Sequence, residues 1–228
     1  MPNRPLSTIG LVMPNDFAAE PYEAIRSRVV AKKEAYPHSW AQYAGAWNAF
    51  AYRFLSCADH DRAFIGSIRR FGNSPPQPER YKQERELFGF FVTGLAAIES
   101  LCYGLFAIAS MLDAQNFPIT KPDHMRSINP EKTTKQFAVA FPEEDITAAL
   151  QQMCTAQDFR DWKEIRNILA HRSTPGRVFH LGGPHHGEAL WVKGIQIDIN
   201  TTASRREWLA ITTCALLNAA DDFTDRNL

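Results

Sequence analysis

Three side chains in one short segment have the types and spacing to act on a phosphate ester. Arg166, Asn167 and His171 lie in a stretch with helical periodicity, and four residues separate the arginine from the histidine. Histidine titrates near neutral pH and can accept or donate a proton. A guanidinium can hold a phosphate through paired N–H donors, and the asparagine amide can position the phosphate or the imidazole. These groups suit RNA cleavage that transfers protons without a metal ion.

The segment from Asp161 to Arg172 resembles the HEPN superfamily, whose hallmark is an arginine, then a polar residue, then a histidine near the end of a late helix. The resemblance implies a metal-independent endoribonuclease of a bacterial defence or toxin–antitoxin system. It further implies RNA as substrate, a homodimer that pairs the motif across a two-fold axis, and an antitoxin protein as a possible partner. The alternative is a non-catalytic HEPN-like module that dimerises or binds a nucleotide or RNA.

A second arginine–histidine match runs from Arg53 to His60, but Phe54 follows that arginine where the family has a polar residue. The later match has asparagine in that place. It also lies on the penultimate predicted helix, before a loop and one more amphipathic helix. This context favours Arg166, Asn167 and His171 as the catalytic candidates.

Helical geometry separates the two ends of the motif. The predicted helix 158–172 carries an apolar stripe, and Arg166 lies at its edge. The stripe consists of Phe159, Trp162, Ile165 and Leu169. Arg166 and His171 are about 140° apart around the axis, so one straight helix cannot easily direct both at one atom. Either the helix unwinds near His171 or a second subunit completes the site, and the resemblance implies the second.

Glu99 is the expected supporting residue. It is the one charged residue between Leu87 and Leu112, a stretch long enough to cross a bilayer. A carboxylate at the middle and several glycines and serines favour a central helix of a bundle instead, so we expect no membrane partner. We expect Glu99 to lie in the interior and to pair with Arg166. A purely structural interpretation is also open, in which that ion pair and a helix-end histidine only stabilise the fold.

Basic residues after the motif could form a phosphate-binding rim. Arg172 and Arg177 are the candidates, together with His180, His185 and His186 in a glycine-rich turn. These histidines have neither cysteine nor a spaced carboxylate nearby, so we expect an exposed loop without a metal site. No cofactor is expected.

The elements that position these residues predict an all-α, HEPN-like helical bundle with a small β-hairpin or meander before the last helix. We expect an N-terminal arm and helix over 1–37 and a helical domain over 38–228, with the β insertion at about 176–201. The expected helices cover about 21–35, 39–70, 79–113, 142–156, 158–172 and 204–224, with loops over 71–80 and 114–130. Capping boxes are predicted at Ser39 and Ser204.

An aromatic stripe marks one face of the second predicted helix. It consists of Trp40, Tyr43, Trp47, Phe50 and Phe54. Core packing is the first interpretation. The third functional hypothesis is an unrelated bundle in which this stripe lines a pocket for a small ligand.

Composition limits the remaining possibilities. The chain has 228 residues, of which 45% are hydrophobic, enough for a sizeable core. Lys plus Arg and Asp plus Glu number 25 each, so composition does not indicate a strongly basic nucleic-acid binder. The four cysteines form no CxxC pair, which favours reduced thiols. The start of the sequence lacks the pattern of a signal peptide, and we expect a cytoplasmic protein.

Overall fold

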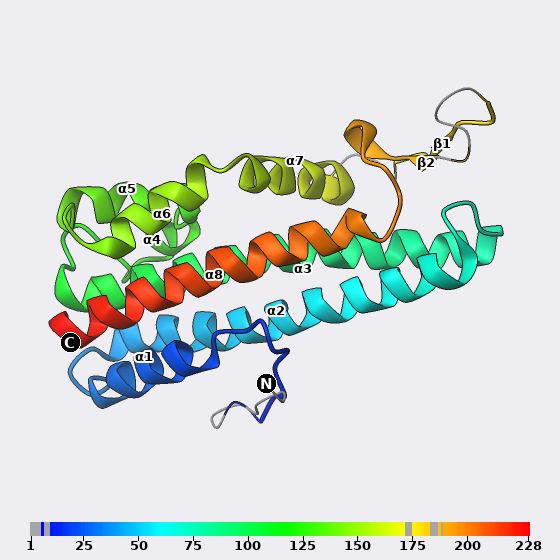
Figure 1. Cartoon of the computed structure of the whole chain (residues 1–228). Helices are drawn as coiled ribbons and strands as arrows, with labels where there is room; N and C mark the ends of the chain where they lie inside the picture. The colour runs from blue at the N-terminus through cyan, green and yellow to red at the C-terminus, as the bar shows by residue number, and fades with distance from the viewer. Residues whose placement is uncertain (1–5, 7–9, 172–174, 183–186, 188) are drawn as a thin grey trace.

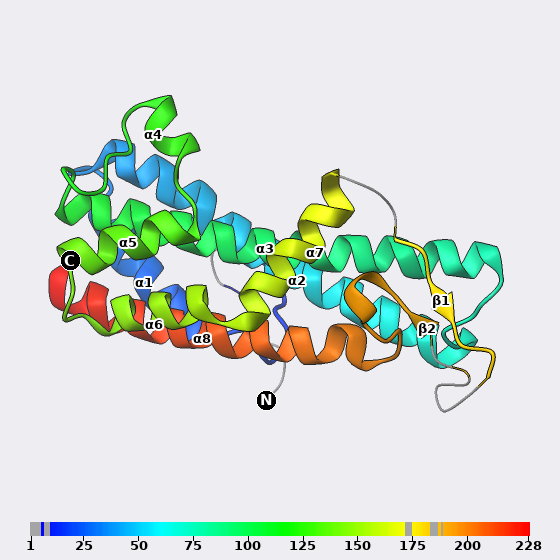
Figure 2. The same ribbon diagram turned by 90° about the horizontal axis from the view of Figure 1, so that it is seen from above.

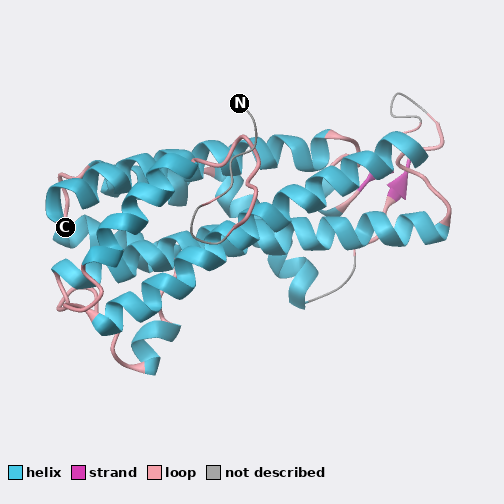
Figure 3. Cartoon of the chain, turned by 90° about the horizontal axis from the view of Figure 1, so that it is seen from below, coloured by secondary structure: helices cyan, strands magenta, loops and turns pink. Residues whose placement is uncertain are grey.

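The computed structural model describes residues 6, 10–171, 175–182, 187 and 189–228. It is an all-α bundle with one tiny hairpin before the last helix, which confirms the predicted fold class (Figures 1 and 3). The helices are α1 (Ala19–Ala31), α2 (Pro37–Phe71), α3 (Gln77–Leu112), α4 (Pro122–Arg126), α5 (Pro130–Ala140), α6 (Asp145–Thr155), α7 (Gln157–His171) and α8 (Asn200–Asn227). Strands β1 (Val178–Phe179) and β2 (Ala189–Leu190) and the 3-10 turn η1 (Val192–Gly194) lie between the last two helices.

Helices α2 and α3 form a long antiparallel pair, and α8 lies along them (Figures 1 and 2). The aromatic stripe of α2 faces this interior: Tyr43, Trp47, Phe50 and Phe54 are buried, and Trp40 packs against them partly buried. Stacking of Trp47 on Tyr43, with ring centroids 5.0 Å apart, illustrates the density of this packing. The core interpretation of the stripe is confirmed.

Among the described residues, α3 is the one helix long and apolar enough to cross a membrane. Its most apolar stretch is 78% buried inside the protein, as in a core helix. The glycines that interrupt this helix are sites of close approach. A Cβ atom on Gly94 would meet the Trp162 ring of α7 at 2.1 Å, and one on Gly89 would meet the His60 ring of α2 at 2.3 Å. Glycine therefore lets both neighbouring helices pack close to α3.

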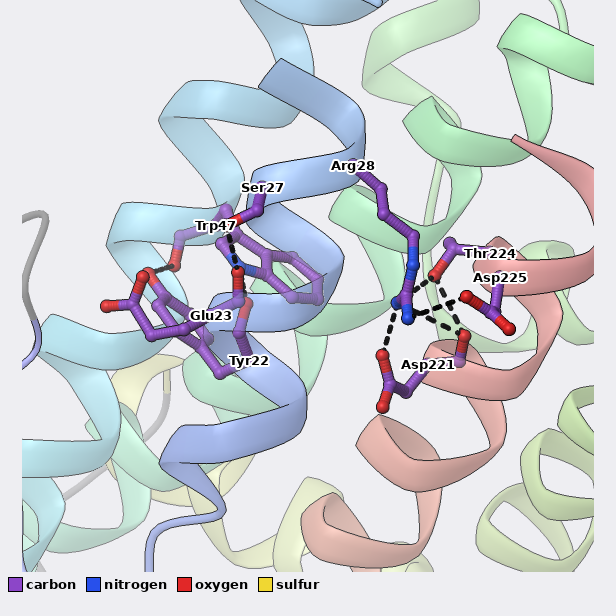
Figure 4. A network of polar contacts seen from close by, with 8 residues as sticks. All are labelled: Tyr22, Glu23, Ser27, Arg28, Trp47, Asp221, Thr224 and Asp225. Carbon is purple, nitrogen blue, oxygen red and sulfur yellow. Dashed lines mark hydrogen bonds and ion pairs between the residues drawn. The ribbon is translucent and has the colours of Figure 1, made fainter. Parts of the chain in front are cut away.

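Helix α1 is joined to two different helices by polar contacts (Figure 4). Tyr22 and Trp47 exchange hydrogen bonds through their side chains and main-chain oxygens, at 3.2 Å each. On the opposite side, Arg28 of α1 pairs with Asp221 and, at 2.9 Å, with Asp225 of α8. The N-terminal helix thus shares one core with the rest of the described chain.

The β element is smaller than the sequence predicts. Strands β1 and β2 pair antiparallel over two residues each, and a single bridge joins Leu190 to Gln196. The isoleucine alternation at 195–199 is not a strand. Instead, Ile197 is buried and donates its main-chain N–H to Ala189, while Ile199 is exposed beside the start of α8. Of the alternating isoleucines, Ile197 is the one that is fully buried, and it lies in an extended connection and not in a strand.

Several helix boundaries differ from prediction. Helix α4 lies within the loop expected over 114–130, and nearly all of α5 lies in a stretch to which no element was assigned. Asn129 caps α5 by accepting a 2.8 Å hydrogen bond from the Lys132 N–H. Both predicted capping boxes are wrong. Ser39 lies inside α2, where its hydroxyl accepts from Ser110, and α8 begins before Ser204, at Asn200. The N-cap of α8 is Ile199, and Asp198 before it accepts a 2.7 Å hydrogen bond from the Asn200 N–H.

Candidate functional site

The helix that carries the motif is anchored to α3 through Trp162. Its indole N–H donates to the Phe91 carbonyl at 2.9 Å, and its ring stacks on Phe90 with centroids 5.1 Å apart. Phe159 and Ile165 are buried on the same face, and Leu169 is partly buried. Figure 2 shows α7 crossing α3, with its C-terminal end projecting past α3. The apolar stripe therefore fixes the orientation of the polar residues beside it.

Arg166 pairs with Glu99, as predicted. The Nη2 atom of Arg166 donates to Glu99 Oε1 at 2.8 Å. Glu99 does not lie in the interior, however, because its side chain is 42% exposed and that of Arg166 is 24% exposed. A pair so open to water contributes little to stability, so its main effect is to hold the guanidinium in one place.

An open groove of about 540 Å³ begins at this ion pair, because Glu99 also forms part of its wall. Residues of α2 and α3 line it, together with Ile128 and Asn129. Its polar lining consists of Gln42, Arg53, Glu99, Ser100, Tyr103 and Asn129. The Arg166 guanidinium therefore lies at the edge of a polar groove rather than on a flat surface.

Two side chains of the groove are held by contacts between α2 and α3. Arg53 donates to the Ser100 hydroxyl and, at 3.3 Å, to the Ala96 carbonyl. Tyr103 donates its hydroxyl to Gln42 Oε1 at 2.9 Å. Arg53 is itself exposed, so part of its guanidinium remains available to an anion in the groove.

The other two motif residues lie away from the ion pair. Asn167 is half-buried and His171 is exposed at the last position of α7. No side-chain hydrogen bond joins either of them to another described residue. His171 lies about 7.5 Å farther along the helix axis than Arg166, on another face. The structure thus brings Arg166 together with Glu99 but does not bring His171 to the same point within one chain.

The earlier arginine–histidine match has a structural role. His60 Nδ1 lies 2.7 Å from Glu86 Oε2, and its ring covers Gly89. Burial raises the pKa of Glu86, but hydrogen bonds from His60 and Arg85 lower it more, so the net shift is downward. His60 therefore helps to join α2 to α3, and only Arg53 of that pair lines the groove.

Of the two arginines predicted to form a phosphate-binding rim, Arg177 is the one that the structure describes. Arg177 is buried, and its guanidinium donates to Glu84 at 2.7 Å, to Gln83 at 2.7 Å and to the Asn73 carbonyl at 3.0 Å. Burial lowers its pKa, which Glu84 opposes. These contacts join the hairpin to α3 and leave no exposed guanidinium for a rim. Arg172 lies outside the described residues.

Of the three histidines in the glycine-rich turn, His180 is the one that the structure describes. His180 is half-buried, and His185 and His186 lie outside the described residues. Within the described ranges, no group of three or more His, Cys, Asp or Glu side chains could hold a metal ion. The four cysteines are free thiols, and burial raises the pKa of Cys57 and Cys102.

Sequence reasoning missed Arg53 as a site residue. The sequence marks Arg53 only as part of the disfavoured match with His60, and its place beside Glu99 in the groove depends on how α2 packs on α3. Comparison with models of known families, with curated proteins and with solved structures found no significant match for this chain.

Proposed function

We propose that this protein is a metal-independent endoribonuclease of a bacterial defence or toxin–antitoxin system, acting in the cytoplasm as a homodimer. The observation that carries the proposal is the partly exposed Arg166, held by Glu99 at the edge of a groove that also contains Arg53. Two guanidinium groups beside one open groove suit the backbone of a single RNA strand. An antitoxin protein that covers this groove would be the natural inhibitor.

In this mechanism, a proton acceptor takes the proton of the ribose 2′-hydroxyl. The 2′ oxygen then forms a bond to phosphorus, and the bond from phosphorus to the 5′ oxygen breaks. Imidazole can serve as the acceptor or as the donor that protonates the leaving oxygen. Arg166 stabilises the negative charge that develops on the phosphate, and Asn167 positions the phosphate or the imidazole.

A second candidate function is a non-catalytic module that binds RNA or a nucleotide in the same groove. The state of His171 favours it, because no described residue orients the exposed imidazole. Catalytic histidines are commonly oriented by another group. In the enzyme, RNA or the second subunit must therefore supply that contact.

We expect the purified protein to cleave single-stranded RNA in the presence of EDTA. Imidazole and guanidinium can carry out the proton transfers and the charge stabilisation themselves. The product should bear a 2′,3′-cyclic phosphate, because the internal 2′ oxygen is the nucleophile. Gel electrophoresis and mass spectrometry of the fragments would measure both. A DNA strand of the same sequence should survive, since it lacks the attacking hydroxyl.

We also expect a dimer in which Arg166 of one subunit acts with His171 of the other. The 140° separation of the two residues on one helix is the physical reason. An equal mixture of inactive Arg166→Ala and His171→Ala proteins, after subunit exchange, should then regain about a quarter of wild-type activity. Half of the dimers would be mixed, and each mixed dimer would hold one intact site of its two.

Analytical ultracentrifugation would establish the dimer beforehand. A wild-type protein that stays monomeric at high concentration contradicts the composite site. So does a mixture that remains as inactive as either variant alone, provided that native mass spectrometry detects the mixed dimers.

A further inference from the structure

A second pocket, of about 430 Å³, lies on a different face of α2 from the groove. Three separate segments build it: the N-terminal arm, the C-terminal half of α2 and the first half of α8. Its charged lining residues are Asp16 of the arm, Asp61, Arg62 and Arg69 of α2, and Arg206 of α8.

Arg206 is the most enclosed charge of this pocket. Its side chain is 7% exposed, its Nη2 donates to Asp16 Oδ1 at 2.6 Å, and its guanidinium lies 4.4 Å from the centre of the Phe54 ring. Its Nη1 atom is shielded from solvent but has no hydrogen-bond partner among the described residues. A buried donor without an acceptor costs free energy, so an anion in the pocket is bound more tightly if the Arg206 side chain turns this nitrogen toward it.

Asp61 offers the complementary atom. Its Oδ1 is likewise shielded and has no hydrogen-bond partner in the described part of the chain. Burial raises the pKa of this carboxyl. The nearby Thr202 hydroxyl, by hydrogen bonding to the carboxyl, and then the charge of Arg206 oppose the rise, so both groups lie close to Asp61. Beside the Thr202 hydroxyl, the pocket therefore holds one donor atom, Arg206 Nη1, and one acceptor atom, Asp61 Oδ1, that can each take a further hydrogen bond.

Two arginines on α2 add positive charge to the pocket wall, which favours an anionic ligand. Arg62 already donates to Asp59 at 2.9 Å. Arg69 is exposed, and no ion pair joins it to another described residue. It lies about 12 Å farther along α2 than Asp61, but helical side chains lean toward the N-terminus, so its long side chain can extend back toward the pocket centre.

We propose that this pocket binds hydrogen phosphate, the form of inorganic phosphate that keeps a P–OH group at neutral pH. A P–O⁻ oxygen accepts from Arg206 Nη1 and from Arg69, while the P–OH group donates to Asp61 Oδ1. Sulfate has the same size and shape but no hydroxyl at neutral pH, so it leaves the Asp61 carboxylate facing an anion without a proton between them. The pocket therefore selects phosphate over sulfate. This site is independent of the motif on α7.

The decisive measurement is isothermal titration of the full chain with inorganic phosphate and with sulfate at equal ionic strength near pH 7. We expect phosphate to bind at least about tenfold more tightly, the difference made by one charge-assisted hydrogen bond. Asp61→Asn should narrow that difference, because the amide can donate to sulfate. Ethyl phosphate is a further test, because near pH 7 most of it is a dianion without a P–OH group. We expect it to bind more weakly than inorganic phosphate, and equally tight binding would contradict the role given to Asp61.

Arg69→Ala should weaken phosphate binding about tenfold without unfolding the protein, because this side chain is exposed. Arg70→Ala is the matched control, since Arg70 is exposed on the same turn, lies over the Phe71 ring and does not line the pocket. Equal affinities for sulfate and phosphate would overturn the proposal, as would the absence of phosphate binding. A wild-type preference that persists unchanged in Asp61→Asn would do the same.

Discussion

Replacing His171 with alanine is expected to abolish RNA cleavage, lowering the rate at least about a hundredfold, because it removes the group that transfers the proton. The side chain is exposed at the last position of α7, so its loss should leave the fold intact. Cleavage of a labelled single-stranded RNA, measured beside a thermal melting curve, tests both statements. If the variant and the wild type both leave a broad panel of RNAs uncut, the non-catalytic RNA-binding module replaces the enzyme.

His60→Ala is the matched control for this substitution. His60 belongs to the other arginine–histidine match, but its ring packs on Gly89 and bonds to Glu86. Its removal should lower the melting temperature and leave cleavage by the folded protein unchanged. Loss of activity at a temperature where His60→Ala remains folded would show that the wrong histidine has been assigned.

Arg166→Ala and Asn167→Ala test the other two residues of the motif. Arg166→Ala should reduce cleavage strongly, and because the Arg166–Glu99 pair is exposed, it should change stability by about 1 kcal/mol or less. Asn167→Ala should weaken cleavage less, because Asn167 positions the phosphate or the imidazole and transfers no proton. A melting curve separates loss of chemistry from loss of fold in each case.

The Arg166–Glu99 contact was predictable because both residues are exceptions to a local pattern. Glu99 interrupts a long apolar stretch, and Arg166 borders an apolar stripe, so each needs a partner near the core. The exposure of Glu99 was not predictable in the same way. It depends on the open groove between α2 and α3, which arises from how two whole helices pack.

The groove and the role of Arg53 were likewise not predictable from a local sequence pattern. On α2 alone, Arg53 is one arginine among several. Its importance appears only when α3 places Ser100 and the Ala96 carbonyl within its reach. Arg177 is the converse case, where a basic residue in a glycine-rich region is drawn inward by Glu84 and Gln83. Contacts between segments far apart in sequence decide both outcomes.

Long periodic helices were the most predictable elements, and short or irregular ones the least. The aromatic stripe identified the buried face of α2 because its spacing repeats over several turns. Helix α5 was missed because proline marks both loops and helix starts, and here Pro130 begins a helix that Asn129 caps. Two-residue strands such as β1 and β2 offer too few positions for alternation to register.

Gly94→Ala is expected to destabilise the protein by about 2–3 kcal/mol, because an added methyl group overpacks a rigid core contact. Its Cβ would meet the Trp162 ring at 2.1 Å, and that ring is fixed by stacking on Phe90 and by its hydrogen bond to Phe91. Alanine's higher helix propensity offsets at most about 1 kcal/mol of this cost. Urea unfolding followed by circular dichroism would measure the difference.

Gly45→Ala provides the matched control, since Gly45 also lies inside a helix but its added Cβ would meet nothing within 4 Å. That substitution should stabilise the protein by about 0.5–1 kcal/mol, because alanine loses less backbone entropy on folding. A Gly94→Ala protein as stable as the wild type would mean that α7 can move away from α3 without cost. Such a movement would also separate Arg166 from Glu99, so RNA cleavage by the same variant should fall even where the protein remains folded.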